Sequence, residues 1–241
     1  MSAIDDAAVV DDEVIAQTVR RFAVTLRSTT PILFHADDVS WADKMDQWRT
    51  DPANKKFSRA GDDRTPAWRW VGHVPHDGKV IAIPSDYLMS SFRDAGAMVL
   101  VPGGKSGKTF KSQTQSGMMV ATPFIPLLVR GKPIQVAPVH ALMKERDFNR
   151  HEDAVARLGF SLFVKRVKVG QTKHIRVRAR FDDCSLRFEL VVVDEQITLD
   201  VLRDIITYAG RYKGLGDWRP GGRTPGQYGM FVLESLEQVA A

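Results

Sequence analysis

The sequence of 241 residues contains a single cysteine, Cys184, which excludes an internal disulfide bond and any zinc site built from several cysteines. No apolar run reaches the roughly 18 residues that a membrane-spanning helix needs. The start of the chain also lacks the basic and apolar regions of a signal peptide. Because a lone cysteine is typical of a reducing compartment, we expect a cytoplasmic protein without a membrane partner.

Acidic residues are missing from one long stretch of the chain. Residues 160–181 hold seven lysines and arginines and no acid, although the whole chain has a net charge of only +5. The acids gather near the start instead, where residues 1–13 carry five of them and no base. This uneven distribution predicts an anionic partner for the basic stretch.

The hydrophobic patterning predicts an α+β fold. Strands are expected where apolar and polar residues alternate, at 22–28, 160–169, 174–181, 185–193 and 230–236. Amphipathic helices are expected at 85–96 and 198–209. We interpret Asp182-Asp183 as a tight hairpin turn between two of the strands. The order of strand, strand, helix and strand is that of half a ferredoxin-like unit, so we expect an antiparallel sheet with helices on one face.

The chain is interpreted as an acidic lead-in at 1–21 and one domain at 22–241 with an inserted aromatic and basic subdomain at about 37–79. The insertion holds four of the five tryptophans of the chain: Trp41, Trp48, Trp68 and Trp70. Trp41 and Trp48 share one face of a predicted helix, which favours core packing. Trp68 and Trp70 flank Arg69 beside a basic loop, a weak indication of nucleic-acid binding. The cations of that loop are Lys55, Lys56, Arg59 and Arg64.

The predicted strand at 174–181 places its cationic side chains on one face. These side chains follow each other at roughly 6.6–6.8 Å, which suits the repeat of an extended sugar–phosphate backbone. Nearby acids such as Glu189 are too few to neutralise them. We therefore expect the following residues to contact phosphates, with His174 on the same face: Arg176, Arg178, Arg180, Lys165, Arg166, Lys168 and Lys173.

A second candidate binding element is the stretch 210–229, here called the glycine block, which contains seven glycines. Glycines allow the backbone to approach a ligand closely, and the cations and aromatics between them suit a charged polymer with planar bases. We expect the glycine block to wrap a nucleic-acid strand, with Arg211, Lys213 and Arg219 on phosphates and Trp218 stacked on a base. The alternative is a long surface loop with ordinary turn glycines.

Catalytic and cofactor signals are weak. Residues 102–109 resemble a phosphate-binding loop, but the glycine spacing is one residue short of that motif. No spaced cluster of metal ligands occurs, so we expect neither a metal nor a cofactor. Only His35 and His174 are candidates for general acid or base in a metal-independent ribonuclease.

The sequence TTPILFH at 29–35, the basic central strands and the terminal helix, glycine-rich loop and strand resemble the RAMP superfamily, which comprises the repeat-associated RNA-binding proteins of CRISPR systems. The stretch AGRYKGLGDWRP at 209–220 also resembles a group of phage and prophage proteins. The RAMP resemblance implies a modified ferredoxin-like sheet, related to the RRM. It also implies binding of single-stranded RNA, as in the backbone subunits of an interference complex.

Together these patterns predict a non-catalytic protein that binds single-stranded nucleic acid, with RNA favoured over DNA. Its expected setting is a homo-oligomer or a subunit of a larger nucleoprotein complex of CRISPR or phage type. Two alternatives remain open at this point: a metal-independent endoribonuclease of related fold, and a phage structural or assembly protein whose basic face meets an acidic neighbour.

Overall fold

The computed structural model describes residues 19–36, 38–57, 59, 61–104 and 107–239, so nearly all of the expected acidic lead-in lies outside it. Its strands are β1 (Arg20–Ser28), β2 (Ile32–Phe34), β3 (Ala82–Pro84), β4 (Met118–Val120), β5 (Phe124–Val129), β6 (Lys132–Pro133), β7 (Ser161–Val169), β8 (Thr172–Phe181), β9 (Cys184–Val192) and β10 (Phe231–Val239). Its α-helices are α2 (Val39–Thr50), α3 (Ser85–Gly96), α4 (Lys111–Ser116), α5 (Val136–Ala141), α6 (Phe148–Leu158) and α7 (Leu199–Tyr208). No helix in this described part is long and apolar enough to cross a bilayer.

The larger of two sheets has the strand order β10-β1-β9-β5-β3, with β4 also paired to β9 and β6 to β5. All of these pairings are antiparallel. In the chain, helix α3 directly follows β3 and precedes β4 and β5, and α7 lies between β9 and β10. The structure is therefore α+β with an antiparallel sheet, as predicted, and its order of elements is consistent with a ferredoxin-like unit.

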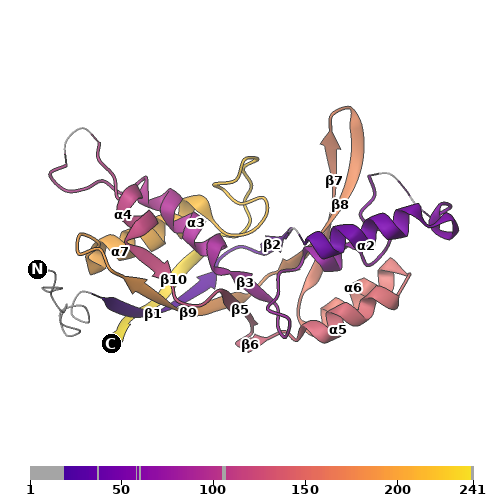
Figure 1. The fold of residues 1–241 in the computed structure, drawn as a ribbon, viewed down its shortest axis with the longest axis horizontal. Coiled ribbons are helices and arrows are strands. Elements are labelled where there is room, and N and C mark those ends of the chain that lie inside the picture. The colour runs from indigo at the N-terminus through magenta and orange to yellow at the C-terminus, as the bar shows by residue number, and fades with distance from the viewer. Residues whose placement is uncertain (1–18, 37, 58, 60, 105–106, 240–241) are drawn as a thin grey trace, which may run out of the picture.

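Only one face of the larger sheet is covered by helices, as Figure 1 shows for α3, α4 and α7. The alternation along β1 explains this arrangement, because Phe22, Val24 and Leu26 are buried while the residues between them are exposed or half-buried. Helix α7 begins at Thr198, whose hydroxyl accepts a hydrogen bond from the Val201 amide as expected. Within the described residues, the β1 side chains that point to the opposite face are exposed or half-buried.

The smaller sheet consists of β2, β8 and β7. Strands β8 and β9 lie in different sheets, so the prediction of a hairpin turn at Asp182-Asp183 is wrong, and these two residues form a corner between sheets. The hairpin is formed instead by β7 and β8, which pair along their whole length from Ser161 and Arg180 to Val169 and Thr172. This β7–β8 hairpin projects from the body of the molecule (Figure 1).

Aromatic packing helps to explain why β8 belongs to the smaller sheet. Phe181 at the end of β8 stacks on Phe160 at a ring distance of 4.9 Å and packs against Phe34 of β2 at 5.6 Å. Trp70 from the insertion is fully buried and donates a hydrogen bond from Nε1 to Nδ1 of His151 in α6 at 3.1 Å. Alternation along the sequence predicted the strand correctly, but it could not distinguish which of the two sheets the strand joins.

The predicted insertion contains α2 and a 3₁₀ helix at Arg69–His73. Trp41 is buried, in agreement with the expected core packing, and its Nε1 donates to the Arg69 carbonyl at 3.2 Å. Trp48, which was expected to share this role, is only half-buried. Residues 102–117 were expected to be a loop, but the described part includes the short helix α4.

The close packing of the glycine block on its own chain can be tested with Gly229→Ala. Gly229 has φ +72°, and a Cβ there would overlap the Leu215 carbonyl oxygen. We expect the left-handed conformation to cost about 1–2 kcal/mol and the overlap to add about 1–3 kcal/mol in urea unfolding. Gly131→Ala is the matched control, because Gly131 has φ +77° with open space around its Cβ position. Equal losses in the two variants would contradict this account.

Candidate nucleic-acid interface

A cleft of about 640 Å³ is lined by both the β7–β8 hairpin and the glycine block. The hairpin contributes Lys165, Lys168 and Arg176 to its lining. The glycine block contributes Trp218 and Tyr228 from the opposite side. Two features that the sequence analysis treated separately, the basic strands and the glycine block, therefore line a single cleft.

The register of the hairpin decides which of its cations share a face. Lys165 of β7 lies directly opposite Arg176 of β8, and Phe163 lies opposite Arg178. Because side chains alternate between the faces of a strand, these four belong to the same face. Arg166 and Lys173 project from the other face and do not line the cleft. Lys168, which also falls on that other face by alternation, nevertheless lines the cleft near the hairpin tip.

The central arginine of β8 is not an exposed phosphate ligand in this structure. Arg178 is only 5% exposed, and its guanidinium forms ion pairs with Asp63 at 3.5 Å and Asp217 at 2.8 Å. The expectation that acids near these arginines are too few is therefore wrong. Both partners come from segments distant in the sequence, the insertion and the glycine block, which are brought to β8 by the fold.

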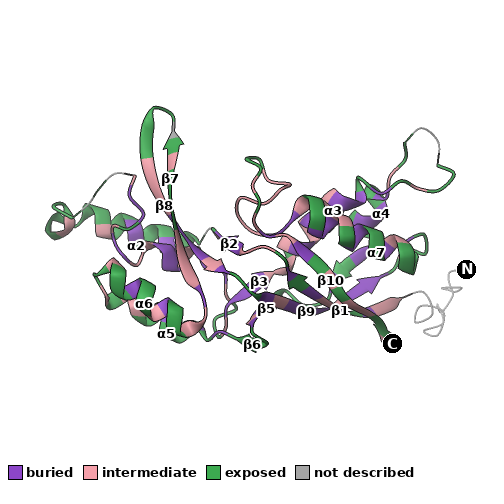
Figure 2. Cartoon of the chain, turned by 180° about the vertical axis from the view of Figure 1, so that it is seen from behind, coloured by how far each residue is buried: buried purple, intermediate pink, exposed green. Residues whose placement is uncertain are grey.

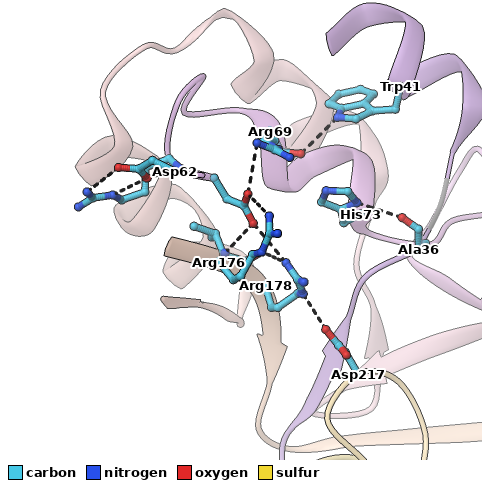
Figure 3. Close-up of polar contacts among 11 residues, drawn as sticks. Ala36, Trp41, Asp62, Arg69, His73, Arg176, Arg178 and Asp217 are labelled. Carbon is cyan, nitrogen blue, oxygen red and sulfur yellow. Dashed lines mark hydrogen bonds and ion pairs between the residues drawn. The ribbon is translucent and has the colours of Figure 1, made fainter. Parts of the chain in front are cut away.

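Asp63 is the centre of this polar cluster. Its buried carboxylate forms ion pairs with Arg69 at 3.3 Å and Arg176 at 3.0 Å in addition to Arg178. It also accepts a hydrogen bond from the Val177 amide at 3.3 Å. Figure 3 shows the three arginines converging from the insertion and from β8. The cluster therefore fixes the hairpin to the insertion.

The remaining cations of the predicted interface are dispersed. Arg180 pairs with Asp182 at 2.6 Å, at the corner between the sheets. Arg219 donates a hydrogen bond to the Lys213 carbonyl at 3.2 Å within the glycine block, and Arg211 lies 6.0 Å from the ring of Tyr212. None of these side chains lines the cleft. Their expected contacts with phosphate stay predictions.

Trp218 occupies a conformation that a bulky residue rarely adopts, with φ +49°. Two cations approach its ring: the Nζ of Lys165 lies 4.7 Å from the ring centre, and the Arg178 guanidinium lies 5.5 Å from it. Phe163 contacts the same ring edge-on at 5.8 Å. A left-handed tryptophan costs about 1–2 kcal/mol, so the packing around the ring must offset that cost. Such strain often marks a functional position.

The glycines make their close approaches to the protein itself. A Cβ at Gly226 would overlap the Trp218 carbonyl, and one at Gly216 would overlap the Leu33 carbonyl of β2. Hydrogen bonds from the Asp217 amide to the Leu33 carbonyl at 2.7 Å and from the Gly229 amide to the Pro31 carbonyl at 2.8 Å fix the block on β2. The glycines therefore serve to seat the block, and its side chains form the cleft wall.

The two candidate catalytic histidines lie apart. His35 lines the cleft and faces His73 at a ring distance of 4.0 Å. The pKa of His35 is lowered well below 6.5, mainly because the ring is partly desolvated, although part of the residue is open to solvent. The neighbouring His73 and Arg178 lower this pKa further. His174 packs over Gly61, and its Nδ1 is buried without a hydrogen-bond partner in the described structure. Within the described residues, no group of three or more potential metal ligands is found.

Sequence reasoning missed Asp63, Asp217 and Tyr228 as parts of this site. Asp63 follows Asp62 in a segment interpreted only as a basic loop, yet the Asp63 amide donates to the Ile175 carbonyl of β8 at 2.9 Å. Asp217 is the only acid between residues 210 and 229, and this was the one signal in the sequence that could have identified it as part of the site. A single acid among four cations indicates an internal partner for one of the arginines.

The role of Asp63 in fixing the hairpin can be tested with Asp63→Ala. Removing the carboxylate deprives three partly or fully buried arginines of their shared partner. Breaking a buried ion pair in this way lowers the free energy of unfolding by about 3–5 kcal/mol. We expect a loss of this size in the free energy of unfolding measured with urea. The control is Asp182→Ala, which removes the more exposed pair with Arg180 and should cost about 1 kcal/mol or less. Comparable losses in both variants would contradict the central role of Asp63.

The histidine pair predicts a pH dependence of stability. Burial is also the main cause that lowers the pKa of His73, which donates from Nδ1 to the Ala36 carbonyl at 3.0 Å. Unfolded histidines take up protons near pH 6.5, whereas these two resist protonation in the folded state. Stability should therefore fall as the pH decreases below about 6.5. Urea unfolding near pH 7.5 and near pH 5 should show a smaller loss in His35→Gln/His73→Asn than in the wild type. An identical loss would show that other groups dominate.

Comparison with known proteins gives only distant likenesses. No family model and no curated protein sequence matches the chain. A chain in the cryo-EM structure of the type III-B Cmr-beta bound to cognate target RNA is 14% identical, with a TM-score of 0.41 over 95% of this chain and 64% of that one. The crystal structure of Cmr6 from Pyrococcus furiosus is 10% identical, with a TM-score of 0.35 over 90% of this chain and 99% of that one.

The first of these structures is of a type III-B Cmr-beta with its target RNA, and the second is of Cmr6. This chain spans slightly less than two thirds of the length of the first of them. With TM-scores below 0.5, neither likeness carries an argument about function, which depends on the cleft and the residues around it.

Proposed function

We propose that this protein binds single-stranded nucleic acid without cleaving it, in the cleft between the β7–β8 hairpin and the glycine block. The observation that carries the proposal is the meeting of exposed cations and aromatic rings across that cleft. Lys165 and Lys168 are exposed, and neither forms an ion pair with an acid among the described residues. Trp218 and Tyr228 lie opposite them.

This combination suits a single strand better than a duplex. Lysine ammonium groups attract phosphates regardless of sequence, and aromatic rings stack on bases only where the base faces are accessible. In a duplex those faces are covered by neighbouring base pairs. Trp218 and Tyr228 both contact Phe163, so their rings are held in place before a ligand arrives. A pre-positioned aromatic wall reduces the entropy lost on binding.

The buried arginines have a supporting role in this proposal. Arg178 neutralises Asp217 and contacts the ring of Trp218, so it positions the cleft wall. Arg176 is partly accessible, with its side chain 26% exposed, and lines the cleft while paired with Asp63. It can offer its remaining donors to a phosphate because a guanidinium has five N–H groups.

The non-catalytic assignment is supported by the state of the histidines. A general acid must carry a proton at the working pH, so the lowered pKa of His35 argues against that role and leaves only the role of general base to its neutral ring. His174 does not line the cleft, and it packs under the insertion instead. The proposed preference for RNA over DNA, and the proposed place in a nucleoprotein complex or homo-oligomer, rest on the resemblance to the RAMP superfamily.

The proposal is tested with Lys165→Ala/Lys168→Ala and a short fluorescent oligouridylate. Each lost phosphate contact reduces the slope of log affinity against log salt by about 0.7 for a single strand, so the double variant should lose about 1.4. Its affinity should fall several-fold at roughly 0.1 M salt. Fluorescence anisotropy across a salt series measures both quantities, and oligothymidylate in parallel measures the preference for RNA.

The charge-matched control is Lys111→Ala/Lys132→Ala, which removes two exposed lysines that do not line the cleft. This control should keep the affinity close to that of the wild type. Equal weakening in both double variants would mean that net charge, and not the cleft, determines binding.

A further inference from the structure

A second cavity, of about 650 Å³, lies in the insertion and shares no lining residue with the cleft. It is formed by the end of α2, by described residues between 51 and 68, and by residues 143, 144 and 146, which precede α6. We call it the aromatic pocket, because Trp48, Phe57 and Trp68 line it. Its volume is within the range of pockets that hold a small organic ligand.

The aromatic side chains of this pocket are held in place, but they are not fully buried in the core. Trp68 is half-buried and packs edge-on against Trp41 at 5.4 Å and 88°, which fixes the orientation of its ring. Trp48 is half-buried, and Phe57 is 50% exposed. Three large rings around an open cavity leave apolar surface in contact with water, which a planar ligand would cover.

The charge around these rings is positive and largely unpaired. Lys56 lies 5.0 Å from the ring centre of Phe57, and Arg59, Lys144 and Arg146 are exposed. Within the described residues, none of these four cations forms an ion pair with an acid. Arg64, by contrast, is held by Asp62 at 2.8 Å and is not available.

Only one acid lines the aromatic pocket, and its carboxylate is already engaged. Asp51 accepts hydrogen bonds from the Ala53 amide at 2.8 Å and from the Asn54 side chain at 3.3 Å, which fixes the chain after α2. The pocket therefore offers rings for a planar group and free cations for an anion. A nucleotide combines these two properties in one ligand.

We propose that the aromatic pocket binds one unstacked nucleotide of the same single strand that occupies the cleft, so this inference rests on the proposed function. The base lies against Trp48, Phe57 and Trp68, and its phosphate meets the surrounding cations. The segment that forms the pocket wall continues to Gly61 and Asp62, which pair with β8 at Ile175, beside the cleft residue Arg176.

The decisive variant is Phe57→Ala/Lys144→Ala, which removes one ring and one cation from exposed positions and should leave folding intact. Its matched control is Phe124→Ala/Lys132→Ala, which removes an exposed phenylalanine and an exposed lysine from β5 and β6. Thermal unfolding of all variants verifies that they fold. Affinity for an oligouridylate long enough to reach both sites is measured by fluorescence anisotropy.

We expect the pocket variant to bind this oligouridylate about fivefold or more weakly, because one base-stacking contact contributes about 1–3 kcal/mol. The control variant should bind like the wild type. Photo-crosslinking with 4-thiouridine in the oligonucleotide should label peptides that contain Phe57 or Trp68, in addition to peptides from the glycine block. In the pocket variant the labelling near Phe57 should disappear while that of the glycine block remains.

Unchanged affinity in the pocket variant, together with no crosslink to residues 51–68 or 143–146, would overturn the inference and leave the cleft proposal standing. If the Lys165→Ala/Lys168→Ala variant binds like the wild type while the pocket variant is weakened, the cleft proposal fails and the pocket is the primary site. If the wild type binds no single-stranded oligonucleotide, both proposals fail.

Discussion

The arrangement of the interface depends on one buried carboxylate, that of Asp63. Three arginines from two separate segments surround it, and the Val177 amide donates to it as well. A carboxylate in so little water is tolerated only because opposite charges and donors replace its hydration. Electrostatic attraction at Asp63 therefore holds the hairpin to the insertion. The pair of Arg178 with Asp217 adds the glycine block to the same arrangement.

Local patterns predicted the elements of this fold well. Alternation predicted the strand at 22–28, and helical spacing predicted the helices at 85–96 and 198–209. Such predictions succeed because burial of one face of an element spaces its apolar residues at a regular interval within a short stretch of sequence. The residues that pair with the arginines of β8 could not be recognised from any such local pattern. Arg178 and Asp63 are 115 residues apart, so their ion pair is a property of the tertiary structure. Because the acidic partners lie so far away in the sequence, the seven lysines and arginines of residues 160–181 were expected to lack them.

The candidate interface was predicted in part for the same reason. Lys165, Lys168 and Trp218 were named from composition and do line the cleft, whereas Arg166, Lys173 and Arg219 were named by the same reasoning and do not. The difference lies in strand register and in how the glycine block folds back on β2. Glycine content indicated a special loop, but only the structure distinguishes close approach to a ligand from close approach to the chain itself.

The way β1 and β8 continue into the other sheet has a mechanical consequence. Strand β1 pairs with β9 in the larger sheet, and β2 pairs with β8 in the smaller one, so two adjacent chain crossings join the sheets at residues 29–31 and 182–183. The glycine block is bonded to Pro31 and Leu33 beside the first crossing, and its Asp217 is paired with Arg178 of β8. Both walls of the cleft are therefore attached to the smaller sheet, and they keep their spacing if the larger sheet shifts.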